Sequence, residues 1–287
     1  MNYYLITTDH LSSGIWFKDE EDFKAAMNVI PVLAAMAGVN VLAFILMSNH
    51  VHFVVGGTHE KALKFITEFK RHCSRYLYFK YGSCKTLKRN QVDIKELSLN
   101  DEGLEKAIAY VQMNSVAAGI CLSPAEYPWG TGSAFFKVSG VKGVPVESMK
   151  GRARYRQLHT KKRVPPGLLL GQDGYILPES YVNTAFVEAI YRRPGRMGYF
   201  LNNSSKAKNR LESGEKDIPV FRDQLLLPFV RDICRALYNK SSVKDLKPAQ
   251  QAEVLRQMRF RCSSNINQMV RVTGIRYEDV VRLLEGL

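Results

Sequence analysis

The chain has 287 residues, 46% apolar and 24% charged, which is the composition of an ordinary globular protein with one sizeable core and a smaller second domain. No apolar run reaches the roughly 20 residues that span a bilayer, and the N-terminus lacks a signal-peptide pattern. The five cysteines are scattered and form no CxxC pair, which fits a reducing cytoplasm. The formal net charge of +14 lies entirely in residues 137–287, which hold 28 basic and 14 acidic residues against 13 of each in residues 1–136.

The first half of the chain alternates strand and helix patterns. Apolar runs and helical spacing first predict a strand over 3–7, a short extended piece over 15–17 and a helix over 23–37. A hairpin of strands 39–47 and 50–55 follows. The remaining elements are a helix over 61–81, a strand over 91–97 and a helix over 104–119. This β-α-β-β-α-β-α order predicts an α+β fold. We expect residues 1–138 to form a ferredoxin-like (split βαβ) domain, an antiparallel sheet with helices on one face.

The second half is more basic and less periodic. Residues 137–163 contain nine basic residues and one acidic residue, and glycines and prolines interrupt any pattern. Residues 139–220 are therefore interpreted as a basic linker or adaptable region. A basic half-chain is typical of nucleic-acid binding, and a solvated surface without a partner is the alternative.

Helical patterning resumes in residues 221–287, which we expect to form an all-α DNA-binding domain. Within it, residues 265–284 predict a helix-turn-helix with Gly274 in the turn and Ser263 or Ser264 capping the first helix. Val280 and Leu283 of the second helix are expected to face inward. A plain helical hairpin is the alternative.

Two pairs of residues carry the candidate chemistry. His50 and His52 alternate on one strand, so both imidazoles point to the same face while Val51 points into the core, and two imidazoles form half of a divalent metal site. Tyr110 and Asn114 are four apart on a predicted helix and share one of its faces, which places a phenol beside an amide. Packed or surface histidines, and a tyrosine that only packs a helix, are the alternatives.

Three segments resemble a known family. The segment AFILMSNHVHFVV is similar to the apolar-Met-Pro-Asn-His-apolar-His strand pair of the single-tyrosine HUH transposases, especially the REP-associated tyrosine transposases. AYVQMNSVAAGI and PAEYPWGTGSAFF resemble that family's Tyr-x-x-x-Asn-Pro-Val-x-Ala-Gly helix and its Tyr-Pro-Trp-Ser-Ser motif. Ser48 and Ser115 stand where the family patterns have proline. The resemblance covers about residues 3–136.

This resemblance implies His50 and His52 as metal ligands, Asn114 as the third ligand and Tyr110 as the nucleophile. The implied cofactor is Mg²⁺ or Mn²⁺, although imidazole ligands also suit zinc and nickel. The implied reaction cleaves and rejoins single-stranded or hairpin DNA through a 5′-phosphotyrosine. The protein would then be a DNA transposase or nickase, a monomer or homodimer, in the cytoplasm and associated with the nucleoid.

Two other functions stay open at this point. The first is a domesticated, catalytically silent regulator that binds DNA with the same fold. The second is an RNA-binding ferredoxin-like domain, which requires exposed aromatic residues on the sheet and an RNP pattern that the sequence lacks.

Basic residues in several regions are candidates for phosphate contacts, with a solvated surface as the alternative. They lie on the helix 61–81, in the loop 82–90, in the basic region and on the last helix. The predicted DNA-binding residues are Lys70, Arg71, Arg75, Lys88, Arg89, Arg152, Arg154, Arg156, Lys161, Lys162, Arg163, Arg276, Tyr277 and Arg282.

Overall fold

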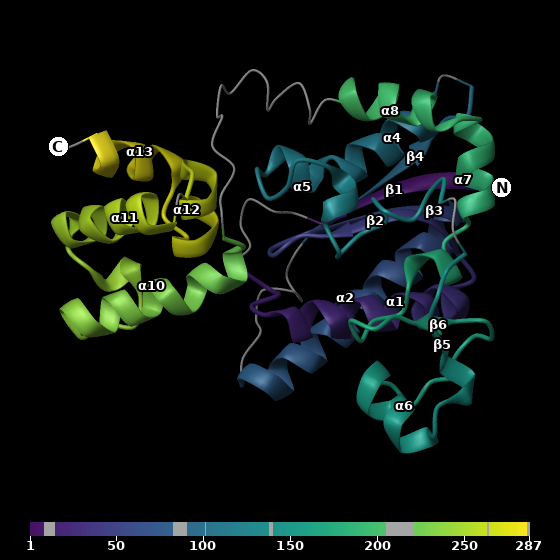
Figure 1. The fold of residues 1–287 in the computed structure, drawn as a ribbon, viewed down its shortest axis with the longest axis horizontal. Coiled ribbons are helices and arrows are strands. Elements are labelled where there is room, and N and C mark those ends of the chain that lie inside the picture. The colour runs from purple at the N-terminus through teal and green to yellow at the C-terminus, as the bar shows by residue number, and fades with distance from the viewer. Residues whose placement is uncertain are drawn as a thin grey trace.

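The structure is a computed structural model that describes residues 1–8, 15–82, 91–100, 102–137, 140–204, 221–262 and 264–285. An N-terminal α+β domain and a C-terminal helical domain lie side by side along the longest axis of the molecule (Figure 1). Within the described residues, no helix combines the length and the apolar character that crossing a membrane requires.

The N-terminal domain is built on one four-stranded sheet. Its elements are β1 (Asn2–Thr8), α1 (Glu20–Ala37), β2 (Asn40–Leu46), β3 (Val51–Gly57), α2 (His59–Tyr81), β4 (Val92–Leu97), α4 (Gly103–Gln112) and α5 (Asn114–Ala117). The strand order is β2-β3-β1-β4, and every neighbouring pair is antiparallel. The predicted succession of strands and helices is confirmed, except that residues 15–17 are not part of a strand.

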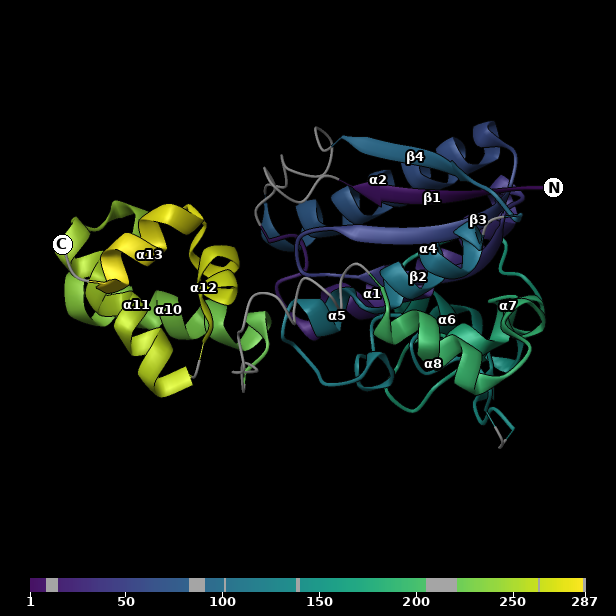
Figure 2. The ribbon, with the colours of Figure 1, turned by 90° about the horizontal axis from the view of Figure 1, so that it is seen from above.

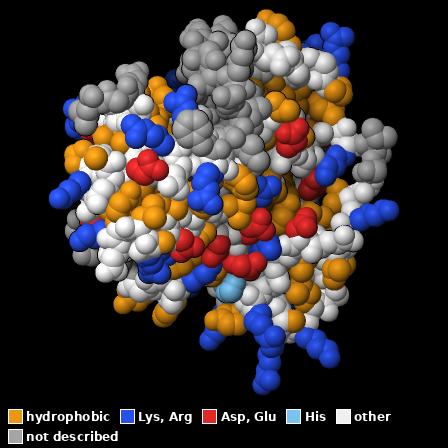
Figure 3. Space-filling model, turned by 60° about the vertical axis from the view of Figure 1, so that its left-hand side comes forward, with side chains coloured by type: hydrophobic (Ala, Val, Ile, Leu, Met, Phe, Trp, Pro, Cys, Tyr) orange, Lys and Arg blue, Asp and Glu red, His pale blue; other side chains and the backbone are white. Residues whose placement is uncertain are grey.

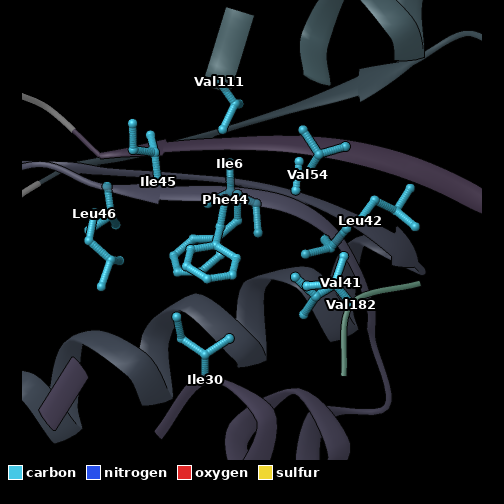
Figure 4. Close-up of a cluster of buried hydrophobic side chains, with 14 of the residues drawn as sticks. Ile6, Ile30, Val41, Leu42, Phe44, Ile45, Leu46, Val54, Val111 and Val182 are labelled. Carbon is cyan, nitrogen blue, oxygen red and sulfur yellow. The ribbon is translucent and has the colours of Figure 1, made fainter. Parts of the chain in front are cut away.

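Helices cover both faces of this sheet, so the expected placement on one face was wrong. Helices α1 and α2 lie below the strands in Figure 1, and α4 lies above them. Side chains alternate accordingly: in Figure 4, Phe44 points toward Ile30 of α1, whereas Ile45 and Val54 lie on the same side as Val111 of α4. Strands β2 and β3 therefore carry apolar residues on both faces, as strands buried on both sides require.

Local signals explain the ends of the helices that frame the hairpin. Asp19 caps α1 by accepting from the Asp22 backbone N–H, while the Asp22 carboxylate accepts from the backbone of Asp19. Gly38 ends α1 in the left-handed region, with φ of 70°. Strands β2 and β3 then pair directly, and the N–H of Met47 donates to the carbonyl of His50 across a two-residue loop.

The region from 140 to 204 is folded rather than a linker. It contains β5 (Val144–Pro145), α6 (Gly151–Leu158), β6 (Leu169–Leu170), α7 (Thr184–Tyr191) and α8 (Pro194–Asn202). Val146, Leu158, Leu168 and Ile176 form a small core of their own, and α7 and α8 join the main core. Asn28 of α1 anchors this region, because its side-chain amide donates to the carbonyl of Gln157 and its Oδ1 accepts from the N–H of Ile176.

The helical domain has its own apolar core. It consists of α10 (Asp223–Tyr238), α11 (Pro248–Cys262), α12 (Ile266–Thr273) and α13 (Tyr277–Glu285). Gly274 joins α12 to α13 in the left-handed region, and Val280 and Leu283 are buried, as predicted. The cap of α12 is Asn265 rather than Ser263 or Ser264, because its side chain accepts from the N–H of Gln268. Figure 2 shows these helices beyond one end of the sheet.

Candidate active site

The hairpin places two histidines on the face of the sheet that α4 covers. Phe53 of β3 packs its ring against Phe65 and Phe69 of α2, so the residues on either side of Phe53 face the opposite way. His52 pairs with Ile45 of β2, whose side chain lies on the α4 side in Figure 4. The predicted sharing of one face by His50 and His52 is visible in their rings, whose centroids are 4.9 Å apart.

The ring of Tyr110 completes this cluster from α4. Its centroid lies 5.6 Å from that of His52, with the two planes at 82°. His50 and His52 are both buried, and Tyr110 is half-buried. Three side chains from two distant segments of the sequence, His50, His52 and Tyr110, therefore meet in one place.

Two polar neighbours orient the imidazoles. The Nδ1 of His50 lies 2.8 Å from Oδ1 of Asn49, and the Nδ1 of His52 lies 3.1 Å from the hydroxyl oxygen of Thr7. Because Oδ1 of Asn49 can only accept, Nδ1 of His50 donates to it and Nε2 is the nitrogen of His50 suited to a metal. Both contacts fix the planes of the rings. Sequence analysis missed Thr7, because only the register of β1 against β3 places it directly opposite His52.

Asn114 follows Tyr110 by one helical turn, as predicted, and its amide binds the helix itself. Its Nδ2 donates to the carbonyl of Tyr110 at 2.8 Å and to that of Val111 at 3.2 Å. This side chain competes with backbone N–H groups for the carbonyls, and the predicted helix 104–119 is interrupted at Met113. Because both contacts use the amide nitrogen, Oδ1 is the atom of Asn114 suited to a cation.

The donor chemistry at this site is imidazole and amide rather than carboxylate. The described residues contain no group of three or more His, Cys, Asp and Glu side chains that could hold a metal ion. Burial raises the pKa of the Tyr110 phenol above its ordinary value, so the hydroxyl is protonated at neutral pH. A phenol in this state becomes a good nucleophile only with help from a neighbouring cation or base.

The turn before His50 is held from two sides. The carbonyl of Ser48 accepts from the N–H groups of Trp16 and Phe17 at 2.8 and 3.1 Å. Its hydroxyl donates to the carboxylate of Asp223, at the first turn of α10, at 2.9 Å. The Ser48 side chain therefore forms a contact between the hairpin and the helical domain.

Asp223 also binds its own domain. Its carboxylate accepts from Nε of Arg271 at 2.8 Å and from the side-chain amide of Gln268 at 3.1 Å, both on α12. Burial alone raises the pKa of a carboxyl, but Arg271 and the hydrogen bonds outweigh burial here and the pKa of Asp223 is lowered. One ionised carboxylate therefore joins the hairpin turn to α12.

The segment PAEYPWGTGSAFF packs along β2 at the edge of the sheet. The hydroxyl of Tyr127 donates to the carbonyl of Leu46 at 2.8 Å, and the N–H of Leu46 donates to the carbonyl of Trp129 at 2.8 Å. A Cβ at Gly130 would lie 2.9 Å from the carbonyl oxygen of Phe44, so the chain passes too close for a side chain. This segment therefore lies along β2, the outer strand of the hairpin.

The predicted DNA-binding residues fall into separate groups. Lys88 and Arg89 lie outside the described residues, Lys70 is half-buried, and Arg71 pairs with Glu68 at 2.5 Å. Arg276, just before α13, and Arg282 on α13 are exposed and both pair with Asp279, and Tyr277 is exposed. The others are exposed or half-buried near α6; these are Arg75, Arg152, Arg154, Arg156, Lys161, Lys162 and Arg163.

No protein-family model matches the chain, and no curated protein matches it either. Among solved structures, one of a REP-associated tyrosine transposase bound to a REP hairpin is similar to it, with a TM-score of 0.35 and 12% identical residues. The match covers 45% of this chain and 76% of the other. It is a weak and distant similarity.

Proposed function

We propose that this protein is a DNA nickase of the tyrosine transposase type, which cleaves and rejoins single-stranded or hairpin DNA. Residues 1–138 would be a ferredoxin-like HUH domain, a proposal supported by the strand order β2-β3-β1-β4 with α1 and α2 on one face. Residues 221–287 would bind DNA through α12 and α13. The observation that carries the proposal is the contact of Tyr110 with His52, beside His50.

His50, His52 and Asn114 would hold a divalent cation, Mg²⁺ or Mn²⁺. Such an ion supplies Lewis-acid activation of a phosphodiester when it is bound. This proposal is supported by Asn49 and Thr7, which lie within hydrogen-bond distance of the Nδ1 atoms of the two imidazoles. The amide of Asn114 is held by the carbonyls of Tyr110 and Val111, so its position relative to Tyr110 is fixed.

Tyr110 would carry out the covalent step. Its hydroxyl oxygen attacks the phosphorus of a phosphodiester, the bond from phosphorus to the 3′ oxygen breaks, and the phenol proton passes through solvent to that oxygen. The products are a 5′-phosphotyrosine and a free 3′-hydroxyl. Because one phosphoester replaces another, the 3′-hydroxyl of a second strand reverses the step without ATP, which is strand transfer. Burial raises the pKa of the Tyr110 phenol above its ordinary value, so the phenol is neutral at pH 7 before the attack.

A covalent-adduct assay tests this function. Labelled hairpin DNA and Mn²⁺ are incubated with wild type, with Tyr110→Phe and with Tyr199→Phe, which changes an exposed tyrosine of α8. Wild type and Tyr199→Phe are expected to give a labelled protein band on a denaturing gel, and Tyr110→Phe none. An adduct that survives Tyr110→Phe would eliminate the nucleophile. DNA binding without an adduct on any hairpin would favour the silent regulator instead.

A further inference from the structure

A basic groove runs between α2 and α6, on the side of the sheet away from Tyr110. Its volume is about 960 Å³, and α2 lines it with Arg75, Tyr76 and Phe79. Tyr155 of α6 and the residues that follow α6 line the other wall. A second hollow of about 430 Å³ continues along α6 and shares Tyr155 with the first. Neither hollow contains Tyr110, His50 or His52.

The charge of this groove has one sign. Every charged side chain that lines the two hollows is Lys or Arg. Lys80 pairs with Asp19 and Asp22, and Lys162 pairs with Glu68. No carboxylate of the described residues lies within salt-bridge distance of Arg75, Arg154 or Lys161. In Figure 3, Lys and Arg side chains project from the lower end of the molecule, which is the height of α6 in Figure 1. Such a groove attracts a polyanion.

Aromatic rings stand among these charges. Phe79 is 80% exposed and Tyr155 is 49% exposed, although water is a poor solvent for either ring. The ammonium of Lys161 lies 5.9 Å from the centre of the Tyr155 ring, and the ring of His159 lies 5.0 Å from that of Tyr76. Open aromatic faces beside cations are the features on which unpaired bases stack while their phosphates are neutralised.

The groove is built into the fold. Asn28, which is buried in α1, donates to the carbonyl of Gln157, and Leu158 is fully buried in the small core. His72 forms part of the lining, is more than nine-tenths buried, and its Nε2 has no hydrogen-bond partner among the described residues. The His72 ring is therefore packed into the wall of the groove rather than open to it.

We infer that the groove between α2 and α6 binds single-stranded DNA at a site separate from the cleaved phosphodiester. The inference rests on the proposed function for the choice of DNA. A duplex would use only the basic residues, since its bases are already stacked, whereas a single strand uses the rings of Phe79 and Tyr155 as well. The groove would hold a flanking segment while Tyr110 acts on the opposite face of the sheet.

The test measures binding without cleavage. Binding of a fluorescently labelled deoxythymidine strand is measured by fluorescence anisotropy in EDTA. The strand has about 15 nucleotides, which is close to the largest number that one single-strand-binding fold covers. The combined variant Phe79→Ala/Tyr155→Ala is expected to bind this strand at least about 5-fold more weakly than wild type. Each base that loses its aromatic partner can weaken binding by up to about 150-fold. The matched control Tyr199→Ala, which removes an exposed ring from α8, should bind as wild type does.

Salt dependence separates the basic residues from the rings. Arg154→Gln/Lys161→Gln should lower the slope of log affinity against log salt by roughly 0.7 for each phosphate that is no longer neutralised. Arg231→Gln, an exposed control on α10, should leave the slope unchanged. Because all these side chains are exposed or half-buried, thermal unfolding should match wild type and verify that the variants fold.

Several results would overturn the inference. If Phe79→Ala/Tyr155→Ala binds the single strand with wild-type affinity, the inference is wrong. If the variant loses as much affinity for a blunt duplex as for the single strand, the groove is a phosphate site without base stacking. A loss confined to a uridine RNA of the same length would assign the groove to RNA. Failure of the proposed function is recognised separately, because binding is measured in EDTA without cleavage. An absent covalent adduct leaves the binding difference between wild type and Phe79→Ala/Tyr155→Ala in place.

Discussion

The hydrogen bond between Ser48 and Asp223 predicts that this carboxylate stabilises the contact between the two domains. Replacement of Asp223 by alanine removes hydrogen bonds from Ser48, Gln268 and Arg271. Loss of one partner from a buried ion pair costs about 3–5 kcal/mol. The side chain of Arg271 is 14% exposed and regains some water, so we expect the lower end, about 3 kcal/mol of unfolding free energy. Ser48→Ala removes one charged hydrogen bond and should cost about 1.5 kcal/mol.

Urea unfolding checks these values with two probes. Both tryptophans, Trp16 and Trp129, are buried in the N-terminal domain, so their fluorescence follows that domain, whereas far-UV circular dichroism follows both domains. Asp223→Ala should shift the dichroism transition more than the fluorescence transition. The control Asp232→Ala, which changes an exposed aspartate of the same helix, should stay within about 0.5 kcal/mol of wild type. A change below about 1 kcal/mol in Asp223→Ala would refute the reasoning.

Three further predictions concern the site and its frame. Thr7→Val removes the hydroxyl beside His52 and should weaken Mn²⁺ binding, measured calorimetrically, about 10- to 100-fold without changing stability. Gly130→Ala forces a Cβ to 2.9 Å from the carbonyl oxygen of Phe44 and should cost about 1–3 kcal/mol in urea unfolding. Burial lowers the pKa of His72 to about 4, so the unfolded chain protonates first and stability falls by about 3 kcal/mol between pH 6.5 and 4. His72→Gln should remove that fall in denaturation curves recorded across this range.

Each of these has a control and a contrary result. Unchanged Mn²⁺ affinity in Thr7→Val would mean that the hydroxyl does not orient His52. The control for Gly130→Ala is Gly140→Ala, which should leave stability unchanged because a Cβ at Gly140 meets nothing within 4 Å. If Gly130→Ala is as stable as wild type, the chain does not pass as close to the carbonyl oxygen of Phe44 as the structure indicates. A wild-type pH dependence in His72→Gln would assign the acid sensitivity to other groups.

The fold of the first half could be predicted from local pattern. Alternation put His50 and His52 on one face of a strand, and helical spacing put Asn114 one turn from Tyr110. These are properties of neighbouring residues, and strand and helix periods determine them. The order of strands and helices followed for the same reason, because each element has its own apolar pattern.

What could not be predicted depends on contacts between distant segments. The register that places Thr7 opposite His52 is not visible in either strand alone. Residues 140–204 resembled a linker because glycines and prolines break their periodicity, yet buried Asn28 of α1 anchors them. The groove combines α2 with a segment about 80 residues later, and the sequence does not reveal that these two segments line one groove.

The most direct test of the central claim is to map the covalent bond. After reaction with hairpin DNA and nuclease digestion, mass spectrometry of the peptides should find a nucleotide phosphate on the peptide that contains Tyr110, with fragment ions that assign it to the phenol. The same phosphate on another residue, or adduct formation that continues when His50 and His52 are both replaced by alanine, would contradict the account.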